Sequence, residues 1–206
     1  MIRKTSRVPS PQRRAQVLDA ATELFARQGF NGTTTREIAD RVGVKETILF
    51  RLFPSKRHLY WAVIDAKSRA TSGRKLLERQ LASGNDELHK FALIARDILE
   101  RNLNDATLTR LLLFSGLEEH ELTERFFRTY IAEYFETLAS YIRRRVREGV
   151  YRNVDPLLSA RGFVGMVFHY FLVQELFGAK RYHKSDIKKV SETLTDIWLA
   201  GMVRRV

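Results

Sequence analysis

The amino-acid sequence predicts an all-α protein. Apolar residues recur at steps of three and four along almost the whole chain, which is the spacing of one helix face. The 206 residues include four prolines and eleven glycines, too few for a turn-rich β fold. We find no convincing strand and no internal repeat. The length is sufficient for one or two domains with a hydrophobic core.

Three short helices are predicted in the first 54 residues. The first begins near Arg14 and ends at Gly29, a residue type that often ends helices in the left-handed conformation. Thr34 and Glu37 then form a T-x-x-E capping box, which begins a second helix that ends at Gly43. The third helix carries the apolar residues Ile48, Leu49, Leu52 and Phe53.

Six further helices, most of them longer, are predicted after residue 55. Ser55 is placed to cap the first of them. Gly149 and Gly178 mark two of the breaks between them. The predicted ranges are about 56–81, 86–103, 108–117, 122–146, 156–177 and 185–204, which makes about nine helices in total. The change from short, basic helices to longer, aromatic ones indicates a domain boundary.

The positive charge is concentrated near the beginning of the chain. The formal net charge is +12, and residues 1–60 hold 12 Lys and Arg against 5 Asp and Glu. This asymmetry indicates a polyanionic partner, either nucleic acid or an anionic membrane, although solubility alone is an equally good explanation of the charge. Residues 1–10 are predicted to form a flexible basic arm with Arg3, Lys4 and Arg7.

Several other classes of protein are disfavoured. The absence of cysteine excludes disulfides, a thiol nucleophile, a zinc finger and an iron–sulfur site. The longest apolar stretch, Gly162 to Val173, is shorter than the roughly 20 residues of a membrane span. The basic N-terminus has no apolar segment of the kind found in secretory signals. We therefore expect a cytoplasmic protein without a membrane partner.

Enzyme motifs are incomplete or missing. His120 and Glu121 begin an H-E-x-x-H zinc motif, but Glu124 stands where the second histidine is required. The chain has no G-x-x-x-x-G-K-[ST], G-x-S-x-G or G-x-G-x-x-G sequence, and its five histidines are scattered. We predict no catalytic residue, no metal site and no cofactor.

The stretch from Thr34 to Phe53 has the pattern of a helix-turn-helix. Ala39 is small where two helices must cross closely, and Gly43 supplies the tight turn. Ile48 and Leu49 would seat the second helix on the core. The positions that then face outward are Lys45, Glu46, Thr47, Phe50 and Arg51, which offer donors, acceptors and an apolar edge to a DNA groove.

Residues 14 to about 64 resemble the DNA-binding domain of the tetracycline-repressor (TetR) family of bacterial regulators. The matching segments are LDAATELFARQGF, TTTREIADRVGV and FPSK, followed by an apolar helix. The resemblance implies a homodimeric, sequence-specific repressor that leaves a palindromic DNA operator when a small hydrophobic effector binds. It implies a DNA-binding domain over residues 11–56 and a helical ligand-binding and dimerisation domain over residues 57–206.

The resemblance also assigns roles to individual residues. Thr35 and Arg36 would face the DNA backbone at the start of the second helix, where amide groups favour phosphate. Lys56 would contact a phosphate at the FPSK closure. The residues placed in or beside the major groove are Lys45, Glu46, Thr47, Phe50 and Arg51, while the arm could follow the minor groove.

Four positions depart from the common pattern of the family. Lys45 replaces the serine that often caps the recognition helix, so we expect that cap to be lost. Thr47 replaces a frequent Gly or Pro, and Phe50 replaces the usual Tyr and its phenol. Glu46 either accepts from cytosine N4 or is engaged with Arg51 or solvent, and the sequence favours neither.

The long helices are rich in aromatic residues. Core packing explains each of them singly, but the set is larger than one bundle needs, which indicates an apolar cavity. The residues predicted to line it are Ile98, Leu112, Phe127, Tyr130, Tyr134 and Phe163.

The last two predicted helices are candidates for a dimer interface. Gly162 and Gly165 would let a neighbouring helix approach closely. As the resemblance implies, two such helices from each chain would make a four-helix interface. The alternative is that these helices pack within one chain.

Two other functions stay open at this point. One is a non-specific architectural DNA binder, which has no need for a large aromatic domain. The other is a helical ligand-binding protein or enzyme without a DNA function, in which the charge serves solubility. The sequence identifies neither the effector nor the operator.

Overall fold

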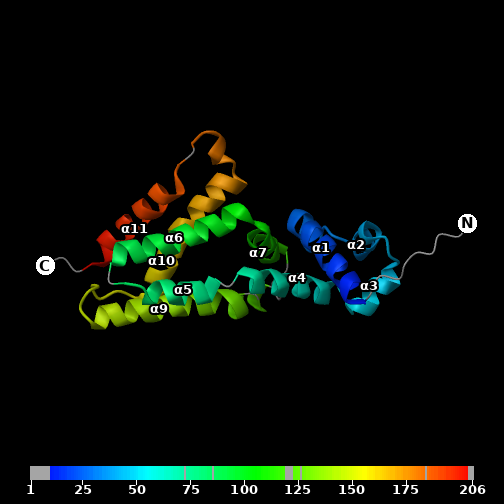
Figure 1. Ribbon diagram of the computed structural model, residues 1–206, viewed down its shortest axis with the longest axis horizontal. Helices are drawn as coiled ribbons and strands as arrows, with labels where there is room; N and C mark the ends of the chain where they lie inside the picture. The colour runs from blue at the N-terminus through cyan, green and yellow to red at the C-terminus, as the bar shows by residue number, and fades with distance from the viewer. Residues whose placement is uncertain are drawn as a thin grey trace, which may run out of the picture. The chain divides into compact units, whose positions relative to one another are not determined.

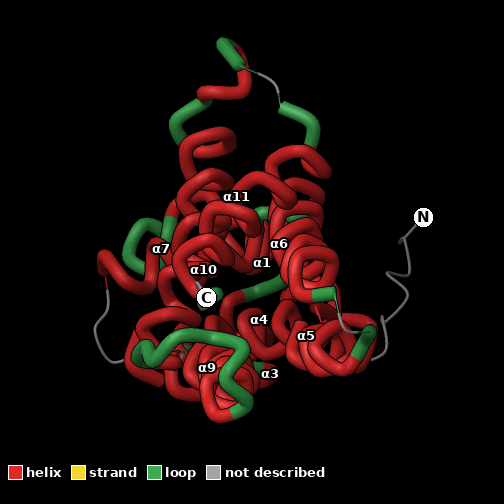
Figure 2. Tube along the Cα trace, turned by 90° about the vertical axis from the view of Figure 1, so that its left-hand side faces the viewer, coloured by secondary structure: helices red, strands yellow, loops and turns green. Residues whose placement is uncertain are grey.

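Helices account for the regular structure of the protein. Its computed structural model describes residues 10–71, 73–84, 86–118, 123–125, 127–183 and 185–203 (Figure 1). Figure 2 shows these residues as helices and loops. Within them, an isolated antiparallel bridge between Tyr151 and Val203 is the one element of β pairing. The all-α prediction is therefore confirmed. Residues 1–9 of the predicted basic arm lie outside the described residues, and residue 10 is the first residue of the first helix.

The first three helices end close to the predicted positions, and the fourth begins at the predicted residue, Lys56. Gly29 and Gly43 follow the first two helices with φ angles of 77° and 71°, the left-handed conformation expected there. The first helix begins earlier than predicted, at residue 10 rather than near Arg14. The four helices are α1 (Ser10–Gln28), α2 (Thr35–Val42), α3 (Glu46–Leu52) and α4 (Lys56–Thr71).

The later helices differ from the prediction in their continuity. The segment predicted as one helix over 56–81 is described as α4 and α5 (Gly73–Ala82). Two other predicted helices contain a turn of π-helix, at Phe127–Ile131 and at Leu172–Leu176. A π turn changes the helical repeat only locally, so apolar spacing does not reveal it. The remaining helices are α6 (Glu87–Asn104), α7 (Thr107–Glu118), α9 (Ala132–Arg147), α10 (Pro156–Phe171), a 3₁₀ turn (Ala179–Arg181) and α11 (Ile187–Met202).

The chain divides into two units, each with its own core. The first contains Met1–Ala70 and Thr107–Arg125, and the second contains Thr71–Ala106 and Phe126–Val206. Helix α7 therefore belongs to the first unit, where it packs against α1. The sequence did not predict this, because α7 is separated from α1 by several intervening helices.

The core of the first unit is built on α1. The ring of Phe25 meets the ring of Tyr60 edge to face, with centroids 4.9 Å apart, and Phe30 meets Tyr60 in the same way at 5.3 Å. Such edge-to-face pairs add to the stabilisation that burial provides. Other buried residues of this core include Ile38, Leu49, Phe53, Leu59, Val63 and Ile64.

In the second unit, α6 packs along α11 and against α10, while α5 packs against α9 (Figure 1). Aromatic rings fill the centre. The ring of Phe163 lies 5.1 Å from those of both Phe91 and Trp198, measured between centroids. The indole Nε1 of Trp198 donates to the carbonyl of Ser159, so the one polar atom of this buried ring is satisfied.

A buried polar cluster lies beside this core. The Glu87 carboxylate accepts hydrogen bonds from the hydroxyls of Tyr141 and Tyr151. Lys90, which is almost fully buried, donates to the Tyr141 hydroxyl at 2.7 Å and lies 3.5 Å from Glu87. Arg145 lies 3.4 Å from the same carboxylate. Burial raises the pKa of both tyrosines, so their hydroxyls stay protonated and donate to Glu87.

Candidate nucleic-acid interface

The helix-turn-helix is anchored by residues that the sequence placed in the core. Ile38, Ala39 and Leu49 are buried, so the inner faces of α2 and α3 are fixed in the core built on α1. The amide of Val44 donates to the carbonyl of Ala39 at 3.0 Å and closes the turn between α2 and α3. These contacts leave the opposite face of α3 free of the core.

The predicted capping box is present at the start of α2. The Thr34 hydroxyl accepts from the amide of Glu37 at 3.1 Å, and the Glu37 carboxylate accepts from the amide of Thr34 at 2.7 Å. The hydrogen bonds from Thr34 hold the pKa of Glu37 below its usual range. A fixed first turn places Thr35 and Arg36 at the free N-terminal end of α2.

The outer face of α3 is exposed as predicted. Lys45, Thr47, Phe50 and Arg51 are all exposed, and Phe50 keeps 43% of its surface in solvent. A phenylalanine this exposed on a short helix offers an apolar contact surface to a partner. Contact between these residues and DNA stays a prediction.

The loss of the N-terminal cap of α3 is confirmed. Lys45 occupies the N-cap position with extended backbone angles and makes no side-chain capping hydrogen bond. Serine, threonine, asparagine or aspartate at this position would satisfy a free amide of the first turn. The sequence therefore has a cation at this position instead of a cap.

Glu46 has a partner that the sequence did not predict. Its carboxylate accepts a hydrogen bond from the hydroxyl of Thr35, which joins the start of α3 to the start of α2. The alternatives weighed from the sequence were acceptance from cytosine N4 and engagement with Arg51 or solvent, and none of them included this contact. The two residues are eleven positions apart, and only the folded turn brings them together.

Lys56 is held at the start of α4 by an aromatic ring. Its amino group lies 4.3 Å from the centre of the Phe30 ring. Burial lowers the pKa of Lys56, and the carboxylates of Glu118 and Glu37 act in the opposite direction. By contrast, Arg36 is exposed and lies 4.0 Å from Asp40, a contact that barely restrains it.

Helix α7 makes three hydrogen bonds to other parts of the first unit, and no sequence signal indicated them. Arg110 Nε donates to the carbonyl of Ala26 at 2.6 Å, and the Tyr60 hydroxyl donates to the carbonyl of Leu111 at 2.9 Å. The Glu118 carboxylate accepts from the amide of Asn31 at 3.0 Å. Helix α1, the turn that follows it and helix α4 are thus held by a segment from far along the chain.

The predicted ligand residues are distributed over both units. Leu112 lies on α7 in the first unit, whereas the other five lie in the second. Ile98 and Phe163 are packed in the core, Tyr134 is partly buried and Phe127 is exposed. The side chain of Tyr130 lies outside the described part. Their role in binding a ligand stays a prediction.

Tyr134 lies beside an ion pair of the second unit that the sequence did not single out. Arg101 forms a 2.7 Å ion pair with Asp97 one turn earlier on α6, and both side chains are mostly buried. Burial raises the pKa of Asp97, with Arg101 opposing this effect, and burial also raises the pKa of Tyr134. The guanidinium of Arg101 fills the space beside Gly73.

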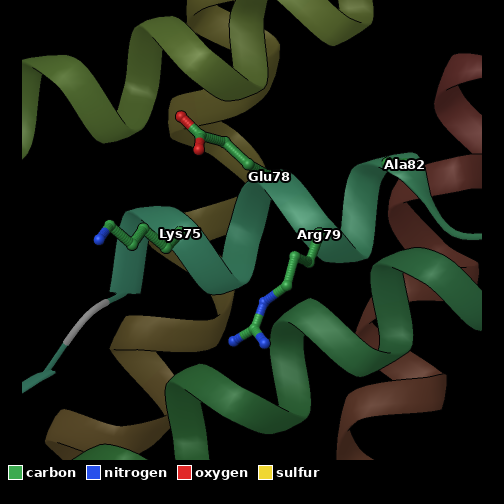
Figure 3. Close-up of a pocket in the computed structure, with 4 residues that line it drawn as sticks. All are labelled: Lys75, Glu78, Arg79 and Ala82. Atoms are coloured by element: carbon green, nitrogen blue, oxygen red, sulfur yellow. The ribbon is translucent and has the colours of Figure 1, made fainter.

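A surface depression of about 680 Å³ on α5 does not coincide with the predicted ligand residues. It is lined by Lys75, Glu78, Arg79 and Ala82, all of them exposed. Figure 3 shows the side chains of Glu78 and Arg79 extending to opposite sides of α5. The described residues contain no group of three His, Asp or Glu side chains that could hold a metal ion.

A helix-turn-helix with an anchored inner face and an exposed, partly basic outer face defines the protein as a DNA-binding helix-turn-helix protein. Residues 17–63 match the tetR family of bacterial regulatory proteins. Residues 86–201 match the C-terminal domain of AefR-like transcriptional repressors. The chain belongs to the TetR family of DNA-binding transcriptional regulators.

Several individual proteins are similar to this chain. Nucleoid occlusion factor SlmA of Vibrio atlanticus is 30% identical over 163 residues, which cover 75% of this chain and 80% of SlmA. The uncharacterised HTH-type transcriptional regulator YvkB of Bacillus subtilis is 25% identical over 188 residues, covering 91% and 95% of the two chains. The transcriptional regulator FadR of Bacillus subtilis, solved in complex with stearoyl-CoA, shares the fold with a TM-score of 0.72 and 17% identity, covering 91% and 98%.

Proposed function

We propose that the protein is a sequence-specific, homodimeric transcriptional repressor of the cytoplasm that leaves a palindromic operator when a small hydrophobic ligand binds. It has no enzymatic activity in this proposal. One observation carries the DNA-binding part. The inner face of α3 is fixed by buried Leu49, while Lys45, Thr47, Phe50 and Arg51 are exposed on the outside. An anchored helix with an exposed outer face is what major-groove recognition requires.

The test is to recover preferred duplexes from a random DNA pool and to measure their affinity as a function of salt. We expect palindromic sequences with half-sites one or more helical turns apart. A dimer that neutralises roughly 6–10 phosphates should give a log–log salt slope of about −0.9 per phosphate. A flat salt response would exclude DNA binding of this kind.

In this proposal the dimer forms through α10 and α11. Leu158 on α10 and Ile197 on α11 are 64% and 57% exposed. Among the described residues, no atom lies within 4 Å of a Cβ placed on Gly162 or Gly165 of α10, which leaves room for a neighbouring helix. Pro156–Leu176 has the length and apolar composition to cross a membrane, yet its helix α10 contributes several side chains to the core. We assign its exposed apolar surface to a second copy of the chain.

The dimer is tested by light scattering coupled to size-exclusion chromatography. Ile197→Glu should convert the protein to monomers and remove binding to palindromic duplexes. Ala82→Glu, which places the same charge at an exposed position of α5, should leave the dimer intact. Equal behaviour of the two variants would exclude this interface.

The ligand part of the proposal concerns the second unit. Its aromatic core and the mostly buried Asp97–Arg101 pair beside Tyr134 offer apolar surface with a few polar groups, as small-molecule sites do. The shared fold with a stearoyl-CoA-bound regulator supports a hydrophobic ligand. The test is mass spectrometry of small molecules extracted from the purified protein, followed by their addition to the protein–DNA complex. A bound molecule that leaves DNA affinity unchanged would contradict a ligand switch.

The functional division of the chain is also proposed, with a DNA-binding domain over residues 11–56 and a ligand-binding and dimerisation domain over residues 57–206. The structural units divide differently, because α4 and α7 belong to the same unit as α1 to α3. In this proposal, ligand binding changes the conformation of α4 and α7, and this conformational change alters the position of the DNA-binding helices.

A second candidate function is a DNA binder that acts on chromosome organisation. The similarity to the nucleoid occlusion factor SlmA favours it. A purely architectural binder would not distinguish a palindrome from a random duplex of equal length, so the duplex-selection experiment separates the two functions.

A further inference from the structure

The turn between α1 and α2 is closed by a side chain from the end of α7. Glu118 is the last residue of α7, and its carboxylate accepts from the amide of Asn31 at 3.0 Å. The same carboxylate occupies the space where a side chain on Gly29 would begin. The backbone amide of Asn31 therefore has a hydrogen-bond acceptor, and this acceptor comes from α7 rather than from the turn itself.

The position of Glu118 is determined by the rest of α7. Arg110 is bonded to the carbonyl of Ala26 near the start of α7, and Leu111 accepts from the hydroxyl of buried Tyr60. These two bonds fix the helix on α1 and α4, so the carboxylate at its C-terminal end has a defined place beside the turn.

The turn also holds the ring on which Lys56 rests. Phe30 lies between Gly29 and Asn31, and the Lys56 amino group is 4.3 Å from the centre of its ring. Glu118 acts electrostatically on Lys56 and favours its charged form. One carboxylate thus fixes the turn that carries Phe30 and supplies a counter-charge to the lysine stacked on it.

We propose that Glu118 is a positioning residue of the DNA-binding unit, which sets the strength of the contact between Lys56 and a DNA phosphate. It does so in two ways. Its hydrogen bond to Asn31 holds the turn and the Phe30 ring in place, which orders Lys56. Its charge competes with phosphate for the same amino group, which limits the affinity of the contact. This inference rests on the proposed DNA-binding function.

Two substitutions separate these effects. Glu118→Gln removes the charge and keeps an oxygen that can accept from Asn31. We expect it to tighten binding to a random-sequence duplex of about 30 base pairs by about two- to fivefold, the range of a weak interaction between partly exposed charges. Glu118→Ala also removes the acceptor, so it should gain less affinity and unfold at a lower temperature than Glu118→Gln.

The comparison with Lys56 decides whether the effect passes through that residue. In a Lys56→Met background, Glu118→Gln should no longer tighten binding, whereas a general charge effect would persist there. Asp19→Asn, at an exposed position of α1, controls for removing a negative charge elsewhere in the same unit. The inference is overturned if Glu118→Gln has no effect, matches Asp19→Asn, or acts equally without Lys56. Failure of the unsubstituted protein to bind any duplex would instead overturn the proposed function.

Discussion

The hydroxyl of Thr35 donates a hydrogen bond to the carboxylate of Glu46, joining the first residue of α2 to the first residue of α3. The family resemblance assigns both residues to DNA, Thr35 to the backbone and Glu46 to the major groove. The bond means that Glu46 does not enter a groove as a free carboxylate. The orientation of the Glu46 carboxylate depends on Thr35, which is itself predicted to face the DNA backbone.

Removal of the Thr35 hydroxyl should therefore change base preference as well as affinity. Thr35→Val keeps the shape of the side chain but frees Glu46, and the missing hydrogen bond corresponds to about 1 kcal/mol. We expect it to alter preference at the same base positions as Glu46→Gln, measured with a panel of duplexes that differ at single positions. Thr35→Ser retains the donor and is the control. A purely uniform loss of affinity in Thr35→Val would contradict the coupling.

Restoring the missing cap of α3 should raise stability and lower DNA affinity. Lys45→Ser supplies an acceptor for a free amide of the first turn, which should raise the free energy of unfolding by about 1 kcal/mol relative to Lys45→Ala. Both variants remove the cation, so both should reduce the magnitude of the salt slope by about 0.9 for each phosphate that is no longer neutralised. Denaturant unfolding and binding at several salt concentrations measure the two effects. Equal stability of the two variants would show that the serine does not cap α3.

Truncating a side chain that contacts phosphate and truncating one that contacts a base should change DNA affinity in different ways. Lys56→Ala should weaken binding to all duplexes alike, because a phosphate contact carries no sequence information. Thr47→Ala on the exposed face of α3 should change the order of preference among duplexes. The measurement is the affinity of each variant for one selected duplex and one random duplex. If both variants lower the two affinities by the same factor, the assignment of α3 as the recognition helix is wrong.

Local signals explain why the helix-turn-helix could be predicted from the sequence. The capping box of Thr34 and Glu37 and the left-handed Gly43 lie within a few residues of the boundaries that they determine. The missing cap at Lys45 could be predicted for the same reason, since capping depends on one side chain and the next turn.

Contacts between distant residues could not be predicted. Asn31 and Glu118 are 87 positions apart, and nothing near either one indicates the other. The assignment of α7 to the first unit depends on such contacts. Single aromatic residues are equally ambiguous: the ring of Phe163 packs against Phe91 and Trp198, and its predicted role in lining a cavity stays a prediction. An apolar residue that lines a cavity and one that fills a core have the same periodicity.

Alanine at two left-handed glycines should have unequal effects on stability. Gly29 and Gly149 have φ angles of 77° and 74°, so alanine costs about 1–3 kcal/mol of backbone strain at either position. At Gly29 the new methyl group must also displace the Glu118 carboxylate, whereas at Gly149 it meets no other atoms of the described residues. We expect Gly29→Ala to lower the thermal unfolding midpoint more than Gly149→Ala. The difference should disappear in a Glu118→Ala background, and its persistence there would show that another contact is responsible.

The buried cluster around Glu87 should make a large contribution to the stability of the second unit. Its carboxylate receives two tyrosine hydroxyls and lies near Lys90 and Arg145, so Glu87→Gln leaves two cations without their shared counter-charge. Breaking a buried ion pair from one side costs about 3–5 kcal/mol, and Arg145, being partly exposed, places the expected loss near the lower limit. Glu133→Gln is the matched control, because its partner Arg74 is exposed and solvent can take the place of the carboxylate. Urea unfolding is followed by the fluorescence of Trp198, which packs on Phe91 in the adjoining core, with both glutamine variants made in a Trp61→Phe background because Trp61 belongs to the first unit. Similar losses for the two glutamine variants would show that Glu87 is solvated and that the cluster does not stabilise the fold.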